Sequence, residues 1–237
     1  MSARSFYEIV LGCGFLAIAW YMIAASSTPD SNVFKNARVE TANASLPALS
    51  RIVLPVPFVV QAPTGNWAQP WQDYCEEASV VMAAHFLWGL PIIPLMAELE
   101  MQIIEQYEVI AFRRHRDTSI DETADIMRRL YGFKNISVRP IRSKADMKDE
   151  LKNGRPVIVP AAGRMLENPY FKAPGPFYHM LVVIGFDDTK DVFITNDPGT
   201  RRGASYAYNQ QKLFAAIHDW NNGDVLRGEK KMIVVGR

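Results

Sequence analysis

Three residues whose side chains could together perform thiol chemistry follow one another along the chain: Cys75, His179 and Asp197. A cysteine nucleophile needs a lowered pKa, a base that can later act as an acid, and donors for the oxyanion formed on the attacked carbonyl. Cys75 opens a run of apolar residues at helical spacing, so we predict that it lies at a helix N-terminus. Unpaired N–H groups there favour negative charge by about 0.3–1 kcal/mol. The pattern predicts nucleophilic catalysis, although a cysteine taken alone is more often a small buried hydrophobe.

His179 is the predicted base among the four histidines. His85 falls ten residues along the same helix as Cys75, too far for contact at a rise of about 1.5 Å per residue. The charged loop around His115 and the late helix around His218 favour surface or packing roles. His179 instead opens a strongly apolar strand, and catalytic groups are commonly presented at such positions.

Asp197 is the predicted partner of His179, because it follows the next apolar strand along the chain. If the two strands are antiparallel neighbours joined by the tight turn at 187–190, both side chains lie at the same end of the sheet. Asp197 would then hold the imidazole in the required tautomer and orientation. The alternative is an aspartate that serves only the turn before Pro198.

The elements expected around these residues form an α+β domain. Helical spacing and cap residues predict helices over 75–88, 95–109, 119–130 and 145–152, with a late helix over 210–220. Short β-branched runs predict strands over 156–160, 179–186, 191–195 and 232–235. A proline-containing extended segment, 52–61, suits only the edge of a sheet. Helices in the first half and an antiparallel sheet in the second half indicate the α+β class.

Composition narrows the possible functions. The 237 residues suffice for one main domain, and 49% hydrophobic with 22% charged residues is typical of a globular chain. The formal net charge is +1, with no basic stripe, which argues against nucleic-acid binding. The sequence contains neither a phosphate-binding loop nor an H-E-x-x-H motif, so no nucleotide, metal or other cofactor is expected. Its two cysteines, Cys13 and Cys75, form neither a disulfide framework nor a zinc motif, which predicts a free thiol at Cys75.

The N-terminal region predicts attachment to a membrane. Residues 6–25 form an apolar run, interrupted by Glu8, that is close to the ~20 residues of a membrane-spanning helix. Arg4 precedes this run, which favours an extracytoplasmic domain on a periplasmic or cell-surface face. A cleaved signal segment, and hence a secreted protein, is the alternative. The expected organisation is an anchor or signal over 1–25, a polar linker over 26–51 and a domain over 52–237.

Five segments carry a resemblance to a known family. The chain order Cys, His, Asp is that of papain-like cysteine peptidases, and the sequence resembles the bacteriocin-leader or double-glycine (peptidase C39-like) family, above all its stand-alone bacterial relatives. The resemblance covers roughly residues 52–236. The matching segments are V56PFVVQ61, D73YCEEAS79, G154RPVI158, Y178HMLVVIGFD187 and N196DP198.

The resemblance implies a papain-like fold, with the nucleophile at a helix start and an antiparallel sheet that carries the histidine and the aspartate. It implies Cys75 as nucleophile, His179 as general base and acid, and Asp197 as orienter. In this clan a glutamine before the cysteine completes the oxyanion hole. Gln61 ends the V-P-x-x-x-Q segment of the stand-alone relatives, and Gln69 has the six-residue spacing of papain-like enzymes; Gln72 also competes.

The chain departs from the double-glycine enzymes after the nucleophile. Those enzymes carry Cys-Gly-Pro or Cys-Gly-Ala and are usually fused to an exporter, whereas this chain has Cys75-Glu76-Glu77 and no transporter region. Bacteriocin leaders are therefore not expected as substrates. The two glutamates suit the first turn of a helix, but a negative side chain beside a thiolate would raise its pKa.

The sequence therefore predicts a cysteine peptidase that cleaves peptide or related amide bonds of a peptide or protein substrate through a thioester. Two alternatives stay open. One is a non-catalytic peptide-binding module of the same fold. The other is a thiol acyltransferase or transpeptidase, in which an amine replaces water as the acyl acceptor.

Overall fold

The computed structural model describes residues 49–113 and 117–236, whose strands form one antiparallel sheet. Its central path runs β2-β7-β3-β4-β5-β6, and β1 pairs with β4 beside that path. In the described residues the strands are β1 (Arg51–Val53), β2 (Ile136–Pro140), β3 (Val157–Ala161), β4 (His179–Asp187), β5 (Val192–Asn196), β6 (Tyr206–Asn209) and β7 (Lys231–Val235).

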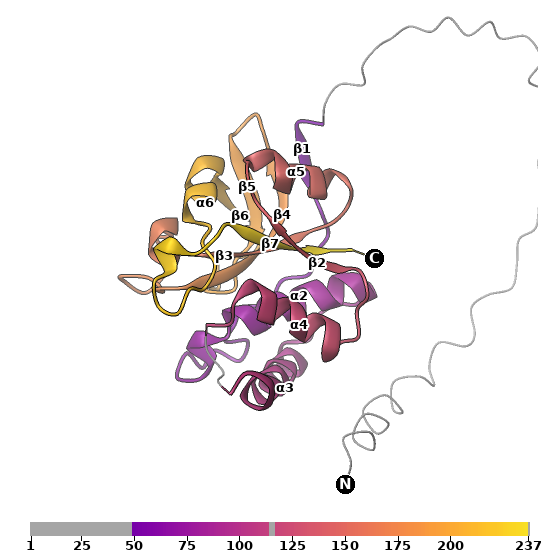
Figure 1. The fold of residues 1–237 in the computed structure, drawn as a ribbon, viewed down its shortest axis with the longest axis vertical. Helices are drawn as coiled ribbons and strands as arrows, with labels where there is room; N and C mark the ends of the chain where they lie inside the picture. Colours follow the sequence, from indigo (N-terminus) through magenta and orange to yellow (C-terminus); the bar gives the residue numbers. More distant parts are fainter. Residues whose placement is uncertain (1–48, 114–116, 237) are drawn as a thin grey trace, which may run out of the picture. The chain divides into compact units, whose positions relative to one another are not determined.

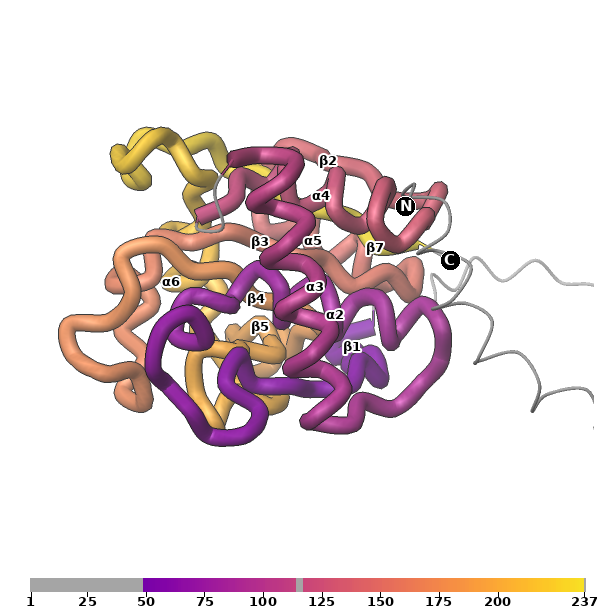
Figure 2. Tube along the Cα trace, turned by 90° about the horizontal axis from the view of Figure 1, so that it is seen from below, coloured from indigo at the N-terminus to yellow at the C-terminus, as the bar shows by residue number. Residues whose placement is uncertain are grey.

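Helices cover both faces of this sheet (Figure 1). The group α2, α3 and α4 lies on one face, and α5 and α6 lie toward the other; seen from below, α3 runs in front of the strands (Figure 2). The α-helices of the described residues are α2 (Cys75–Trp88), α3 (Pro94–Phe112), α4 (Ile120–Arg129), α5 (Lys144–Lys152) and α6 (Gln210–Ala216), and the short 3₁₀ helices are η1 (Trp71–Asp73), η2 (Gly163–Leu166) and η3 (Val225–Arg227).

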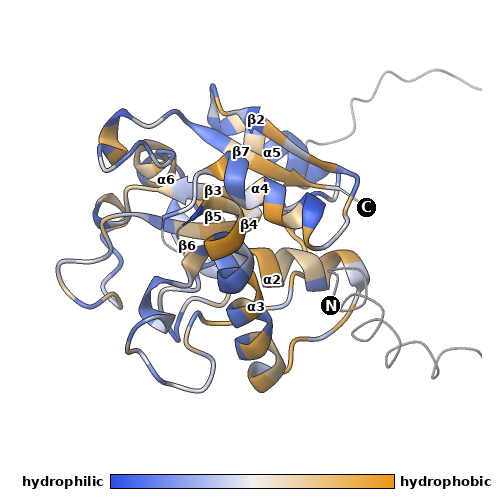
Figure 3. Ribbon diagram, turned by 60° about the horizontal axis from the view of Figure 1, so that its bottom comes forward, coloured by the Kyte–Doolittle hydropathy of each residue, from blue (hydrophilic) through white to orange (hydrophobic). Residues whose placement is uncertain are grey.

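Alternating side chains of the central strands supply two apolar cores. On β4, Met180, Val182 and Ile184 pack in the core shared with α2 to α4, whereas Leu181 and Val183 pack in the core shared with α5 and α6. Because successive side chains of a strand point to opposite faces, a strand covered on both faces must be apolar throughout. All nine residues of β4 are buried, and the central strands form the hydrophobic centre of Figure 3.

The start of α2 is fixed by the residues just before it. Tyr74 is the N-cap residue, it is fully buried, and its hydroxyl donates to the Glu105 carboxylate of α3 at 2.6 Å. The helix ends at Gly89, whose φ of +68° is the left-handed conformation that glycine adopts readily. Cys75 is therefore held at the first position of a helix whose start is joined to its neighbour by a hydrogen bond.

The predicted α+β class is confirmed, and most of the predicted elements are present. The helix expected over 75–88 coincides with α2, and the strands expected around His179 and before Asp197 are β4 and β5. The sequence did not predict β2 and β6, which are short strands at the two ends of the central path. The late helix ends at Ala216 rather than at 220, and of the proline-containing segment predicted over 52–61 only residues 52 and 53 pair as a strand, in β1.

The prediction of a membrane-anchored, extracytoplasmic protein is corrected. Across residues 49–113 and 117–236, no helix combines the length and the apolar character that a membrane span requires. The apolar run over 6–25 on which the prediction rested, and most of the linker predicted over 26–51, lie outside the described residues. The membrane assignment is therefore not kept.

The anchoring role of Tyr74 can be tested by removing only its hydroxyl. Tyr74→Phe should lower the free energy of unfolding by about 1–3 kcal/mol, because a buried hydrogen bond to a carboxylate is lost, and should also change the rate at which iodoacetamide alkylates Cys75. Tyr131→Phe is the matched control, since the Tyr131 hydroxyl donates to Glu100 at 2.7 Å. It should lower stability similarly but leave alkylation unchanged. Equal alkylation changes in both variants would contradict this role.

Candidate active site

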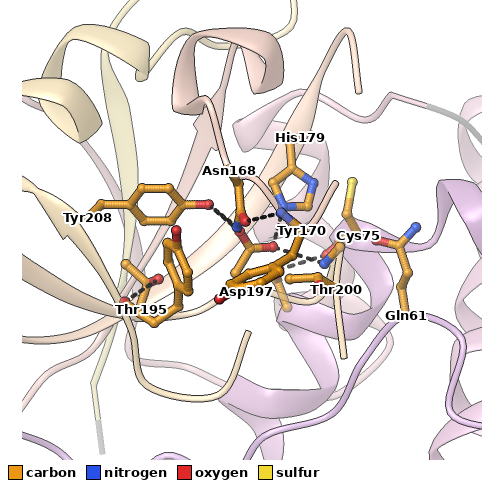
Figure 4. A network of polar contacts seen from close by, with 12 residues as sticks. Gln61, Cys75, Asn168, Tyr170, His179, Thr195, Asp197, Thr200 and Tyr208 are labelled. Carbon is orange, nitrogen blue, oxygen red and sulfur yellow. Dashed lines mark hydrogen bonds and ion pairs between the residues drawn. The ribbon is translucent and has the colours of Figure 1, made fainter. Parts of the chain in front are cut away.

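Cys75 and His179 line the same cleft, which has a volume of about 760 Å³. The cysteine is a free thiol with 7% of its surface exposed, at the start of α2. The backbone N–H of Met180, the residue after His179, hydrogen-bonds to its sulfur and by itself favours a lower pKa of the thiol. In Figure 4 the His179 ring lies between the Asp197 carboxylate and the Cys75 sulfur. The start of a helix and the start of a strand thus meet at one point of the cleft.

Asp197 holds the His179 ring by a hydrogen bond of 2.8 Å between its Oδ1 and the ring Nε2. Strands β4 and β5 are antiparallel neighbours, with Val182 opposite Asn196, so the start of β4 and the residue after β5 lie at the same sheet end. Both side chains are buried, with 1% of His179 and none of Asp197 exposed. The strand pairing therefore produces this contact.

Four donors surround the Asp197 carboxylate. Oδ1 accepts from His179 and from the backbone N–H of Gly199 at 2.9 Å, and Oδ2 accepts from the Tyr208 hydroxyl at 2.5 Å and from Asn168 Nδ2 at 3.2 Å. A carboxylate offers about four acceptor positions, so all are used. Although burial opposes ionisation, the His179 charge and these hydrogen bonds hold the pKa of Asp197 below its usual value. Asp197 is therefore an ionised acceptor.

This arrangement fixes the tautomer of His179. Because an ionised carboxylate only accepts hydrogen bonds, Nε2 must carry the proton and Nδ1 is the basic atom of the neutral ring. Figure 4 places the second ring nitrogen on the side of Cys75. Phe171 contacts the ring edge-on at 5.2 Å between centroids, and a Cβ added to Gly199 would lie 2.9 Å from the ring. Packing therefore limits how far the imidazole can rotate.

The two predicted oxyanion glutamines differ in position. Gln61 is buried and lines the cleft with Cys75, while Gln69 is exposed and is not among the residues of the cleft wall. Gln61 Nε2 donates to the carbonyls of Trp71 at 3.2 Å and Gln72 at 2.5 Å. Its Oε1 has no hydrogen-bond partner within the described part of the chain. Gln61 therefore has the right position, but its amide nitrogen serves two carbonyls.

Glu76 changes the electrostatics that were expected at the helix start. The Cys75 thiol donates to Glu76 Oε2 at 2.9 Å, and both side chains are buried. Burial, followed by the charge and hydrogen bond of Glu76, raises the pKa of Cys75 well above its usual value, against the opposing backbone N–H of Met180. The predicted lowering by the helix N-terminus is thus outweighed, because the helix contributes only about 0.3–1 kcal/mol.

Aromatic and basic side chains form much of the remaining cleft wall. The cleft also contains two aspartates, Asp73 and Asp117, so its charge is mixed. Across the described ranges, no cluster of three or more His, Cys, Asp or Glu side chains could hold a metal ion. The aromatic and basic members of the wall are Trp67, Tyr170, Phe171, Lys172, Phe177, Tyr178, Arg201 and Arg202.

Comparison with known proteins identifies the family. The model of the Peptidase C39 like family matches residues 53–223, which includes Cys75, His179 and Asp197. The chain belongs to the Peptidase C39 like family. Among solved structures it is similar to a Bacillus anthracis protein described as a C39-like peptidase, with 14% identity, a TM-score of 0.45, and coverage of 79% of this chain and 98% of that one. None of the curated proteins matches the chain.

Membership of the C39-like family supports a cysteine-peptidase type of function. The remaining histidines of this C39-like chain lie in other surroundings: His85 contacts Glu100 at 3.1 Å and His218 contacts the Gly228 carbonyl at 3.0 Å. His115 lies outside the described residues.

Sequence reasoning missed two residues of the C39-like site. Asn168 comes from the loop after η2, and Tyr208 from the unpredicted strand β6. They also contact each other, with Asn168 Nδ2 donating to the Tyr208 hydroxyl at 2.7 Å. Neither belongs to a motif, and only the alternation of Tyr206 and Tyr208 hinted at a strand that could aim one of them inward.

The acid side of the stability curve should report on Asp197. Its pKa is lower in the folded chain than in the unfolded chain, so its contribution is present above about pH 4 and is lost as pH falls through the folded pKa. Asp197→Asn should reduce the free energy of unfolding by about 1–3 kcal/mol at neutral pH and flatten its decline below pH 4. Asp149→Asn, an exposed residue paired with Lys152, should keep the wild-type slope. Denaturant midpoints from pH 2.5 to 7 measure both, and an unchanged slope in Asp197→Asn would contradict the assignment.

Proposed function

We propose that this protein is a cysteine peptidase that cleaves peptide or related amide bonds through a thioester formed on Cys75. The observation that carries the proposal is the hydrogen bond of 2.8 Å between His179 and the fully buried Asp197, in a cleft that Cys75 also lines. A nucleophile, a base and a residue that orients the base are the three parts of the catalytic arrangement. Family membership supports the same type of function.

In the proposed reaction the thiol proton passes to Nδ1 of His179, and the sulfur attacks the carbonyl carbon. The imidazolium then gives this proton to the leaving amine, and the acyl group stays on the sulfur as a thioester. His179 next removes a proton from water while the water oxygen adds to the thioester carbonyl. The C–S bond then breaks to release the acid, and the imidazolium returns its proton to the sulfur. Asp197 stabilises the imidazolium and keeps Nε2 protonated throughout, while Nδ1 exchanges the proton.

Three features of the cleft suit a peptide substrate. Its volume of about 760 Å³ is within the range of small-molecule and peptide sites. The exposed Tyr170 and Phe177, at 44% and 49%, present apolar surface at the cleft. Arg202 lies 4.7 Å over the Tyr170 ring, so a charge and an aromatic face are offered together. Such a wall can contact both the apolar and the polar side chains of a peptide.

One observation favours a non-catalytic peptide-binding module as a second candidate. The Cys75 thiol is hydrogen-bonded to a carboxylate and its pKa is raised, which opposes thiolate formation. A binding module would retain the cleft and its aromatic wall without using the sulfur. Reactivity of Cys75 therefore separates the two candidates.

Loss of either proton-transfer partner should abolish catalysis while the fold is kept. Cys75→Ser, Cys75→Ala and His179→Gln should each reduce peptide hydrolysis by at least about 10³-fold, and the two Cys75 variants should no longer react with a thiol-directed, peptide-like probe. Circular dichroism should show unchanged secondary structure. His85→Gln is the control and should retain activity. Hydrolysis that persists in Cys75→Ala would reject the proposal, and a probe-inert wild type would favour the binding module.

The two glutamines form a matched pair for testing the oxyanion donor. Gln61→Ala should lower kcat by about 10²–10³-fold with little change in KM, because the donor acts on the transition state. Gln69→Ala should stay within about threefold of wild type, since Gln69 is exposed and lies outside the cleft wall. The reverse order would assign the role to Gln69, and two wild-type values would leave the oxyanion to Gln72, which also lines the cleft, or to backbone donors.

A further inference from the structure

A titratable side chain other than His179 touches the sulfur of Cys75. The thiol donates to Glu76 Oε2 at 2.9 Å, and the two residues occupy the first turn of α2. Glu76 is 2% exposed, and its other oxygen, Oε1, is buried and has no hydrogen-bond partner among the described residues. The family resemblance assigns no role to this position. The nucleophile of the proposed function is therefore in direct contact with a carboxyl group whose solvation is poor.

The described residues around Glu76 provide hydrogen bonds and further carboxylates. On α2 it faces the Cys75 thiol, and Glu77 is its neighbour; from the segment before α4, the Asp117 carboxylate and the Thr118 N–H act on it. From the segment just before β4, Tyr178 lies close enough that the charge of Glu76 raises the pKa of its hydroxyl. No Lys or Arg of the described ranges forms an ion pair with it. Burial first, and then the charge of Asp117, raise the pKa of Glu76 to about 8 against the thiol and N–H contacts.

The two protonation states of Glu76 have opposite effects on the sulfur. A neutral carboxyl group can donate its O–H to a thiolate, and hydrogen bonding to the charged form favours that form. An ionised carboxylate can only accept, so it holds the proton of the thiol and repels a negative sulfur. The same contact at 2.9 Å therefore promotes or suppresses the thiolate, depending on one proton.

We propose that Glu76 is a further catalytic residue, whose protonation state decides whether Cys75 can form the thiolate. In the competent state Glu76 is neutral and donates to the sulfur, while the thiol proton moves to Nδ1 of His179. In the arrested state Glu76 is ionised and the proton stays on the sulfur, in the S–H to Oε2 hydrogen bond. The two states therefore differ by one proton, which the Glu76 carboxyl group keeps in the competent state and gives up to solvent in the arrested state. This role rests on the proposed function, since it concerns the same nucleophile.

Glu77 is the matched control for Glu76. It is the next residue on α2, it is 1% exposed, and burial followed by the charge of Glu108 also raises its pKa. Its charge reaches Cys75 more weakly than that of Glu76, and no hydrogen bond joins it to the thiol. Substitution of Glu77 therefore removes a buried carboxyl group from the same turn without removing the contact with the sulfur.

The pH dependence of Cys75 alkylation tests the proposal. Wild type, Glu76→Gln, Glu76→Ala and Glu77→Gln would be treated with iodoacetamide from pH 5 to 10, and modification of the Cys75 peptide followed by mass spectrometry. Glu76→Gln keeps a donor but cannot ionise, so its reaction at pH 9 should be about tenfold faster than wild type, as one pKa unit implies. At pH 6 it should match wild type within about threefold, while Glu76→Ala, which lacks the donor, should be slower. Glu77→Gln should stay within about threefold of wild type throughout.

The outcomes separate this proposal from the proposed function. A Glu76→Gln curve that superimposes on wild type or shifts to higher pH, or an equal shift in Glu77→Gln, would overturn the role of Glu76. Peptide hydrolysis measured in parallel tests the function itself. If wild type hydrolyses peptides, the alkaline limb of kcat/KM should move to higher pH in Glu76→Gln, and an unmoved limb counts against the proposal. If wild type hydrolyses no peptide while the alkylation curve of Glu76→Gln shifts as expected, the proposed peptidase function is rejected, and control of the thiol by Glu76 is supported.

Discussion

The hydrogen bond between His179 and the buried Asp197 joins the ends of two neighbouring strands and sets the direction of the imidazole. It requires a charged carboxylate with no exposed surface, which is costly unless the charge receives hydrogen bonds on all sides. The loop after η2, the turn after β5 and the strand β6 each supply a donor to it. The end of the sheet that borders the cleft thus supplies several groups that stabilise this one charge.

The pairing of His179 with Asp197 could be predicted because it follows from local signals. Each residue borders an apolar run, and a tight turn between the runs requires antiparallel neighbours whose free ends coincide. The start of α2 at Cys75 could be predicted for the same reason, from helical spacing that begins there and ends at Gly89. These inferences need only the period of a segment and the geometry of one connection.

Two of the donors to Asp197, Asn168 and Tyr208, could not be predicted, because they reach the carboxylate through tertiary contacts. Asn168 is 29 positions from Asp197 in the sequence, and Tyr208 lies on the short strand β6, which the pattern did not reveal. The choice between Gln61 and Gln69 had the same difficulty. Spacing favoured either residue, whereas burial decides which of them reaches the cleft. The contact between Glu76 and the thiol joins two consecutive residues of one helix, which no periodicity encodes.

Two buried carboxyl groups with opposite surroundings flank Cys75 and His179, the proposed nucleophile and base. Asp197 receives four hydrogen bonds and its pKa is lowered. One oxygen of Glu76 has no hydrogen-bond partner in the described part of the chain, the Asp117 carboxylate acts on it, and its pKa rises to about 8. Such a division of pKa values is how one site assigns a charged and a neutral role to the same chemical group. A unit charge about 4 Å away is worth about 4 kcal/mol at an effective dielectric constant of 20, several times the contribution of a helix N-terminus. The charge state of Cys75 therefore depends on the proton of Glu76 more than on the helix that carries both residues.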